Sequence, residues 1–259
     1  MIDAAPTTLM VAAMVIPLLG AIGILVFGES QRNMREAVTL LTAGITFFVV
    51  LSLLGQVLEG ARPILTVLTL EAGLSFRFAV EPLGMLFAVI ASGLWIVNSI
   101  YSIGYMRSNK EPRQTTFYIC FAIAISSTLG IAFAGNLVTL FLFYEILTLS
   151  TYPLVTHKGD ATAIAGGRVY ILVLLGTSMI LLLPAVIWTY VIAGTTYFTD
   201  GGILAGKTSA AVTGVLLALF VFGIGKAALM PGHFWLPSAM VAPTQSLSRS
   251  RDFAQSAMS

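Results

Sequence analysis

Charged residues are scarce in this chain of 259 residues: Asp, Glu, Lys and Arg together make up only 9% of it. Hydrophobic residues account for 58%, and the mean hydropathy is +0.96. Soluble domains usually carry roughly 25% charged residues, so this composition predicts a membrane protein. The net charge of +2 arises from Lys and Arg scattered through short loops, which excludes the basic patch that nucleic-acid binding requires.

Cysteine and the common catalytic motifs are also missing. Cys120 is the only cysteine, which excludes an intrachain disulfide framework and a cysteine-rich metal site. No HExxH, GxSxG or dinucleotide-binding glycine motif occurs. The string GIGK at 223–226 is not a phosphate loop, because Phe220 occupies the first glycine position and Ala227 follows the lysine. We therefore expect no bound cofactor, no metal ion and no catalytic site in this chain.

Long apolar runs are abundant and predict an all-α, polytopic membrane bundle of about seven transmembrane helices. Residues 1–6 contain no Lys or Arg, so the first run is interpreted as a retained helix rather than a cleaved signal peptide. Alternating polar and apolar residues over 59–80 predict a short hairpin outside the membrane. The expected spans lie near residues 7–27, 37–58, 82–106, 115–134, 137–155, 169–193 and 210–230.

The positions of Lys and Arg predict the orientation in the membrane. Most of them lie in the loops near residues 30, 110 and 160, so we expect these loops in the cytoplasm and the N-terminus outside, in a bacterial inner (plasma) membrane. His157 and Lys158 then belong to a solvated loop and need no further role. Glu81 ahead of Pro82 is an ordinary acidic helix start. The inner set is Arg32, Arg35, Arg107, Lys110, Arg113, Lys158 and Arg168, and the outer set is Arg62, Arg77 and Lys207.

Two ionisable residues lie inside the expected spans. Glu145 occurs within NLVTLFLFYEILTLSTYPLV, and Lys226 occurs within VTGVLLALFVFGIGKAALMPGHFWLP. An ionisable group at the bilayer centre costs about 3 kcal/mol, so each needs a partner, a water-filled cavity or a function. One acid and one base in two spans predict a path for proton transfer. The alternatives are that Glu145 pairs with an arginine of a neighbouring subunit and that Lys226 extends to the membrane surface.

The last apolar run is interrupted at Pro231-Gly232, which predicts a broken helix. Proline lacks the N–H that would bond to the carbonyl of Ala227, and the freed backbone groups must be covered by protein or water. Membrane transporters place such breaks beside their ion sites. His233 follows the break and is a candidate proton relay, with a structural histidine that caps exposed carbonyls as the alternative.

Two strings together carry a family resemblance: FYEILTLSTYPLV at 143–155 and GIGKAALMPGHFWLPSAMVAPT at 223–244. They resemble the large proton-conducting subunits shared by Mrp-type monovalent cation/proton antiporters and the membrane arm of respiratory complex I. The first string looks most like the D-type subunit of the Mrp antiporters. The resemblance implies that Glu145 and Lys226 form the ion pair of a proton half-channel and that His233 serves proton access. It also implies the first half of an inverted-repeat fold.

The end of the chain departs from the family pattern. We divide the chain into a three-helix membrane region (1–114), an incomplete first antiporter repeat (115–244) and a polar tail (245–259) that is rich in Ser and lacks an apolar run. The family continues after the second string with a further helix and a second inverted repeat. We therefore expect a truncated subunit, for which a frameshift is favoured over a premature stop or a split gene.

The sequence leaves two classes of function open. In the first, the chain forms one half-channel of a multisubunit monovalent cation/proton antiporter, or of an M- or N-like pumping subunit of an NADH-quinone oxidoreductase. In the second, it is a nonconducting assembly fragment. The expected partners are other membrane subunits, the lipid bilayer, protons and sodium or potassium ions.

Overall fold

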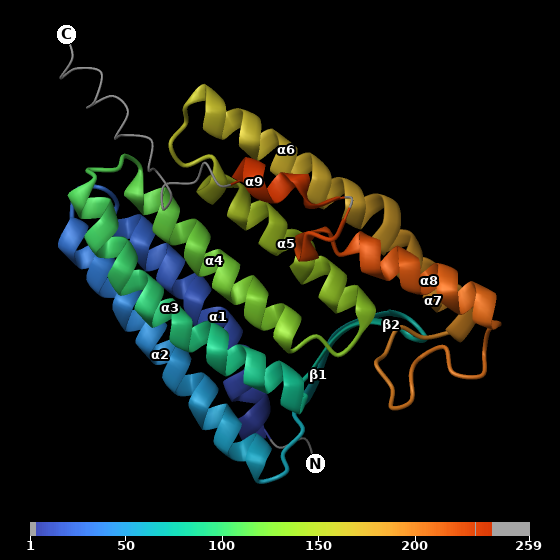
Figure 1. Ribbon diagram of the computed structural model, residues 1–259. Coiled ribbons are helices and arrows are strands. Elements are labelled where there is room, and N and C mark those ends of the chain that lie inside the picture. Colours follow the sequence, from blue (N-terminus) through green and yellow to red (C-terminus); the bar gives the residue numbers. More distant parts are fainter. Residues whose placement is uncertain (1–3, 231, 240–259) are drawn as a thin grey trace.

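The computed structural model describes residues 4–230 and 232–239. Pro231 and the polar tail expected at 245–259 therefore lie outside the described residues. Most of the described chain is helical, and the helices lie side by side (Figure 1). The elements are α1 Ala4–Phe27, α2 Arg32–Leu58, β1 Ile64–Glu71, β2 Leu74–Ala79, α3 Pro82–Ser108, α4 Gln114–Ala132, α5 Leu137–Val155, α6 Ala161–Thr177, α7 Leu183–Ala193, α8 Ala210–Gly223 and α9 Trp235–Ala239.

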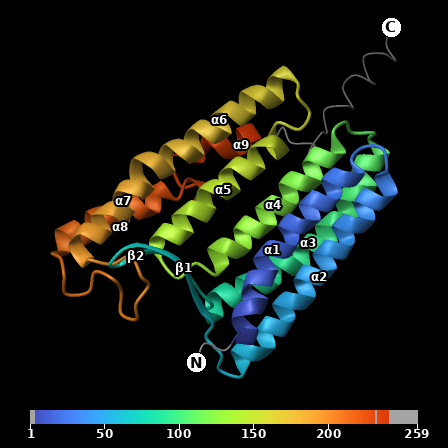
Figure 2. The same ribbon diagram turned by 180° about the vertical axis from the view of Figure 1, so that it is seen from behind.

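The main apolar core lies among the first four helices. Met10 of α1, Val50 of α2, Trp95 of α3 and Leu129 of α4 are almost completely buried there. α5 packs against α4, α6 packs against α5, and α8 lies along α7 on the side of the molecule away from α2 (Figure 2). Many large apolar side chains on the outer faces stay exposed, which suits helices surrounded by lipid.

Six helical segments in the described part are long and apolar enough to cross a membrane. They correspond to the first six expected spans. The sixth is longer than expected, because α6, the π-helical turn Ser178–Leu182 (η1) and α7 form one run of 33 residues. It begins at Ala161 rather than near 169, since the Asp160 side chain caps the helix by accepting from the backbone N–H of Ala163 at 2.6 Å.

The seventh expected span is shorter than the sequence suggested. α8 ends at Gly223, and a 3₁₀ turn, Gly225–Ala227 (η2), replaces the helix that was expected to continue to residue 230. Lys226 therefore lies in this turn and not inside an α-helix. Ala228 then adopts a left-handed conformation with φ of 50°, which changes the direction of the chain.

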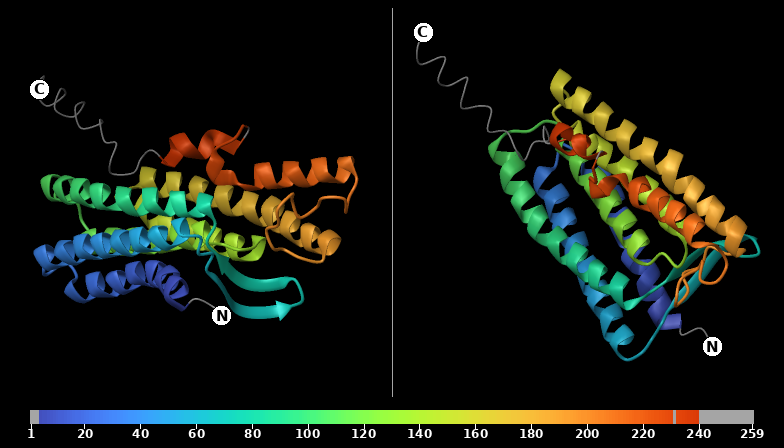
Figure 3. Two further views of the ribbon diagram at one scale, coloured as in Figure 1. Left: turned by 90° about the horizontal axis from the view of Figure 1, so that it is seen from below. Right: turned by 45° about the vertical axis from the view of Figure 1, so that its right-hand side comes forward.

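The expected hairpin over 59–80 is confirmed as the antiparallel pair β1–β2. It lies at the end of the bundle where the N-terminus lies, beyond the ends of α1, α2 and α3 (Figure 3). The backbone of Ala79 donates to Phe133 at 2.8 Å, and Thr196 donates to Gly73 at 3.0 Å. The hairpin thus joins the α4–α5 and α7–α8 loops at one end of the bundle.

Buried polar contacts join the loops at the opposite end. Arg35 is completely buried, and its guanidinium donates to Glu29 at 2.8 Å and to Gln114 at 2.7 Å. Burial tends to raise the pKa of Glu29, but the bonds from the Thr115 N–H and from Arg35 hold it below its usual range. Arg113 donates to the backbone carbonyl of His157. The loops near residues 30, 110 and 160 therefore share one end, as the charge pattern predicted.

His157 differs from its expected place in a solvated loop. Its side chain is buried and packs edge-on against Phe117 of α4. Burial lowers the pKa of its imidazole, because desolvation disfavours the charged form. His157 thus helps to fix the α5–α6 loop against α4.

Candidate functional site

Lys226 lies against the middle of α5, where the chain turns after α8 (Figure 1). Its ammonium group donates to the backbone carbonyl of Tyr144 at 2.9 Å and to the hydroxyl of Thr148. Thr148 is completely buried, and its hydroxyl donates in turn to the carbonyl of Tyr144 at 2.9 Å. Neutral oxygens of one helical turn of α5 therefore hold the lysine.

Tyr144 contacts Lys226 in two further ways. The Lys226 ammonium lies 3.4 Å from the centre of the Tyr144 ring, well within the range of a cation–π interaction. The backbone N–H of Lys226 donates to the Tyr144 hydroxyl at 3.1 Å. This N–H would have bonded to the carbonyl four residues earlier if α8 had continued, so Tyr144 replaces one helical hydrogen bond at the break.

Glu145 follows Tyr144 on α5 and is buried. Neither of its carboxylate oxygens has a hydrogen-bond partner among the described residues. Among the described residues, the ion pairs join Arg35 and Arg107 to Glu29 and Glu36 near the loops. None of these pairs includes Glu145 or Lys226. The acid and the base lie in neighbouring positions without direct ionic contact, so their pairing stays a prediction.

Two glycines allow the chain to turn beside the π-helical turn η1. A Cβ atom on Gly223 would lie 2.6 Å from the backbone nitrogen of Leu182, and one on Gly225 would overlap the hydroxyl oxygen of Thr177. Side chains at either position would collide with the α6–η1 segment. The break therefore begins at Gly223, earlier than the expected Pro231-Gly232.

The segment after the break returns to the site. Gly232 and His233 belong to the 3₁₀ turn Gly232–Phe234 (η3), which leads into α9. His233 is exposed, and none of the hydrogen bonds in the described part joins it to Glu145 or Lys226. Trp235, two residues later, is buried, and its indole N–H donates to the carbonyl of Gly225 at 3.0 Å.

Several polar residues around Lys226 were not singled out by sequence reasoning. Tyr170 of α6 shares a 2.6 Å hydrogen bond with Thr151 of α5 and packs edge-on against Trp235. Thr148 was detectable in principle, because it lies three residues after Glu145 on the same face of a helix. Trp235 was part of the second family string but carried no buried charge to draw attention to it.

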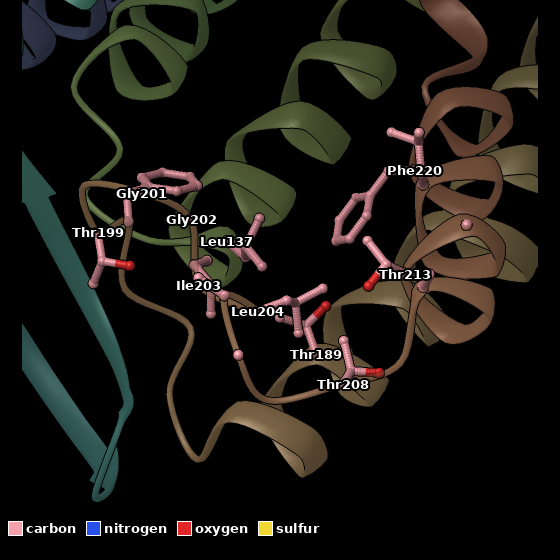
Figure 4. A pocket seen from close by; sticks show the side chains of 16 residues that line it. Leu137, Thr189, Thr199, Gly201, Gly202, Ile203, Leu204, Thr208, Thr213 and Phe220 are labelled. Atoms are coloured by element: carbon pink, nitrogen blue, oxygen red, sulfur yellow. The ribbon is translucent and has the colours of Figure 1, made fainter.

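Two cavities in the described part of the chain lie away from the buried acid. A pocket of about 910 Å³ lies between the α7–α8 loop and α5, α7 and α8, and no ionisable side chain lines it (Figure 4). A second, apolar cavity of about 490 Å³ lies between η1 and α8 and reaches Thr177 and Gly225. Within the described residues, no three His, Cys, Asp or Glu side chains come together as a metal site.

The long apolar helices define a multi-pass membrane protein, and comparisons with known proteins add its likeness to antiporter subunits. Residues 134–247 match the family described as "NADH:quinone oxidoreductase/Mrp antiporter, TM". The structure of the Mrp complex from Dietzia sp. DQ12-45-1b superposes with a TM-score of 0.75 at 24% identity, covering 92% of this chain and 26% of that chain. The chain carries a domain of this antiporter family, as its sequence predicted.

Two curated relatives represent both branches of the family. The A-type subunit of a Na(+)/H(+) antiporter from Alkalihalophilus pseudofirmus is 30% identical over 179 residues, 66% of this chain and 22% of the relative. NAD(P)H-quinone oxidoreductase chain 5 from Synechocystis is 27% identical over 248 residues, 89% of this chain and 36% of the relative. The chain thus spans about a fifth to a third of their length. Neither relative is a D-type antiporter protein, so that assignment stays a prediction.

Proposed function

We propose that this chain is a subunit of a multisubunit monovalent cation/proton antiporter, in which Glu145 and Lys226 form a proton half-channel. The relatives and the family match support an antiporter-like role. The observation that carries the proposal is a buried carboxylate that has no hydrogen-bond partner among the described residues, next in sequence to the residue that holds a lysine ammonium.

The chemistry of the two groups suits proton transfer. A buried polar group without a partner costs about 1–3 kcal/mol, and more when it is charged, so the approach of a cation such as the Lys226 ammonium would stabilise Glu145. The Lys226 ammonium is held by two neutral acceptors and a ring, not by a carboxylate. A small movement of the Lys226 side chain toward Glu145 would stabilise the charge of the lysine. Separation of the two side chains would favour release of the proton from Lys226. In this scheme Lys226 carries the proton and Glu145 modulates it.

The remaining parts of the proposal concern access, orientation and partners. His233, exposed beyond the break, relays protons between Lys226 and water. The chain lies in a bacterial inner membrane with its N-terminus outside and the loops near residues 30, 110 and 160 in the cytoplasm. It works with other membrane subunits and exchanges protons for sodium or potassium ions. These subunits would supply the exit path for the proton.

A proton-pumping subunit of an NADH-quinone oxidoreductase is the second candidate. It is favoured by the relative from Synechocystis, which aligns with 89% of this chain, against 66% for the antiporter relative from Alkalihalophilus. Both candidates use the same buried acid and base. Cation-dependent proton movement without a quinone reductase distinguishes the antiporter from the pump.

Substitution of the two ionisable residues tests the proposal. In everted membrane vesicles that contain the assembled complex, Glu145→Ala and Lys226→Ala are expected to abolish cation-dependent proton movement, whereas Glu145→Asp retains it. Lys207→Ala serves as the control, because the Lys207 side chain is exposed and donates to the carbonyl of Ala193 at the end of α7. Full activity of an assembled Lys226→Ala complex would refute the half-channel.

A further inference from the structure

The turn that carries Lys226 is held from two sides. On the α5 side, the Tyr144 hydroxyl accepts the Lys226 backbone N–H at 3.1 Å. On the opposite side, the Trp235 indole N–H donates at 3.0 Å to the carbonyl of Gly225, the residue before the lysine. The same carbonyl closes the 3₁₀ turn by accepting from the N–H of Ala228 at 3.1 Å. A carbonyl oxygen has two acceptor sites, and this one uses both.

Trp235 is itself firmly placed. Its ring is buried and packs edge-on against Tyr170 of α6, with 5.5 Å between ring centres and an interplanar angle of 72°. Tyr170 is also buried, and its hydroxyl bonds to Thr151 of α5 at 2.6 Å. A continuous series of contacts therefore runs from α5 through Tyr170 and Trp235 to the carbonyl beside Lys226.

We propose that Trp235 is a positioning residue that holds the Lys226 turn against α5 through its indole N–H. This inference rests on the proposed role of Lys226. Without the bond from Trp235, the turn keeps the internal bonds of Ala227 and Ala228 and the contacts of Lys226 with Tyr144 and Thr148, but loses its tie to α6 and α9. The ammonium would then spend less time between the Tyr144 carbonyl and the Thr148 hydroxyl, the acceptors that stabilise its protonated form.

The sharpest test removes one N–H without changing shape. Benzothienylalanine in place of Trp235 keeps a fused ring of almost the same size but replaces the N–H by sulfur, so ring packing against Tyr170 is preserved. We expect the rate of cation-dependent proton movement per assembled complex to fall about fivefold to tenfold, the effect of one lost neutral hydrogen bond. The pH of half-maximal activity should move to a lower value, because the protonated amine has lost support.

Two controls complete this experiment. Trp188→Phe in α7 alters another tryptophan whose side chain is 37% exposed, and its rate and pH profile should stay those of the unsubstituted protein. Trp235→Phe also lacks the N–H and should reproduce the shifted pH profile. Each rate is divided by the amount of assembled complex, which is measured by native gel electrophoresis of the same membranes.

The outcomes separate the two proposals. An unchanged rate per complex and an unchanged pH profile in the benzothienylalanine variant would overturn the positioning role. This holds even if the variant assembles less complex, because the rate is expressed per assembled complex. If Lys226→Ala abolishes proton movement in that case, the half-channel stands and only the role of Trp235 fails. If Lys226→Ala retains activity, the proposed function fails first.

Discussion

Lys226 is surrounded by groups that carry no formal charge of their own. The Tyr144 carbonyl and ring and the Thr148 hydroxyl contact its ammonium, and the buried Glu145 lies one residue beyond Tyr144. Neutral acceptors bind an ammonium more weakly than a carboxylate does, so they stabilise the protonated amine less and its proton can still be released. Such a setting fits a residue that must gain and lose a proton in each cycle.

The contact between the Lys226 ammonium and the Thr148 hydroxyl can be tested by substitution. Thr148→Val replaces the hydroxyl with a methyl group of similar size, and we expect proton movement to fall about tenfold, because the ammonium loses one acceptor. Thr148→Ser keeps the hydroxyl and should retain most activity. Thr128→Val in α4 is the matched control, since its hydroxyl bonds only to the carbonyl of Ala124. Equal activity of the Thr148→Val and Thr148→Ser proteins in everted vesicles would contradict the assigned contact.

At the scale of elements, the end of α8 and the π-helical turn η1 fit one another. Gly223 at the end of α8 lies against Leu182, and Gly225 of η2 lies against Thr177, where a side chain on either glycine would collide. A hydrogen bond to the Tyr144 hydroxyl and one from the Trp235 indole N–H then replace helical bonds that are lost where α8 ends. A broken helix is stable inside a membrane only when its freed backbone groups are bonded in this way.

Two glycines of α8 provide a matched comparison. Gly223→Ala places a methyl group within 2.9 Å of three Leu182 atoms, including backbone, so we expect it to destabilise the protein by about 1–3 kcal/mol. Gly214→Ala, in the same helix, meets nothing within 4 Å and should be neutral or slightly stabilising. Thermal denaturation of the purified complex measures both. Equal melting temperatures for the two variants would show that α8 does not pack closely against η1.

At the scale of the whole molecule, polar contacts are concentrated at the two ends of the bundle. Arg35, Glu29 and Gln114 join the loops at one end, and the β-hairpin joins those at the other. The ion pairs of the described residues all belong to the first of these ends. The middle of the bundle contains Glu145 and Lys226, where a charge is most costly and proton transfer is of most use.

Labelling with a membrane-impermeant maleimide tests the orientation. In a Cys120→Ser background, Lys207→Cys is expected to react in intact cells, because the proposed orientation places the α7–α8 loop outside. Ser30→Cys should react only after the cells are permeabilised, since it lies in the α1–α2 loop. Both positions are exposed, so differences in reactivity report the side of the membrane. The reverse pattern would place the N-terminus in the cytoplasm.

Much of the fold could be predicted from the sequence because a helix that crosses lipid needs a long run of apolar residues. Each expected span from 7–27 to 137–155 corresponds to a helix, and the polar interval 59–80 forms the expected hairpin. Helix boundaries were less predictable where one side chain decides them, as Asp160 does for α6. The sequence indicated a break at Pro231-Gly232, whereas α8 ends at Gly223, which packs closely against Leu182.

The sequence by itself determined that this is a membrane protein and that Glu145 and Lys226 are isolated ionisable residues within long apolar runs, because apolar length and isolated charge are local properties. Only the tertiary structure decided what surrounds them. Tyr144, Thr148 and Trp235 become partners of the Lys226 turn through contacts between segments that are about 80 residues apart, or ten in the case of Trp235. Such contacts depend on how α5, α8 and α9 pack together, and no local pattern encodes that packing.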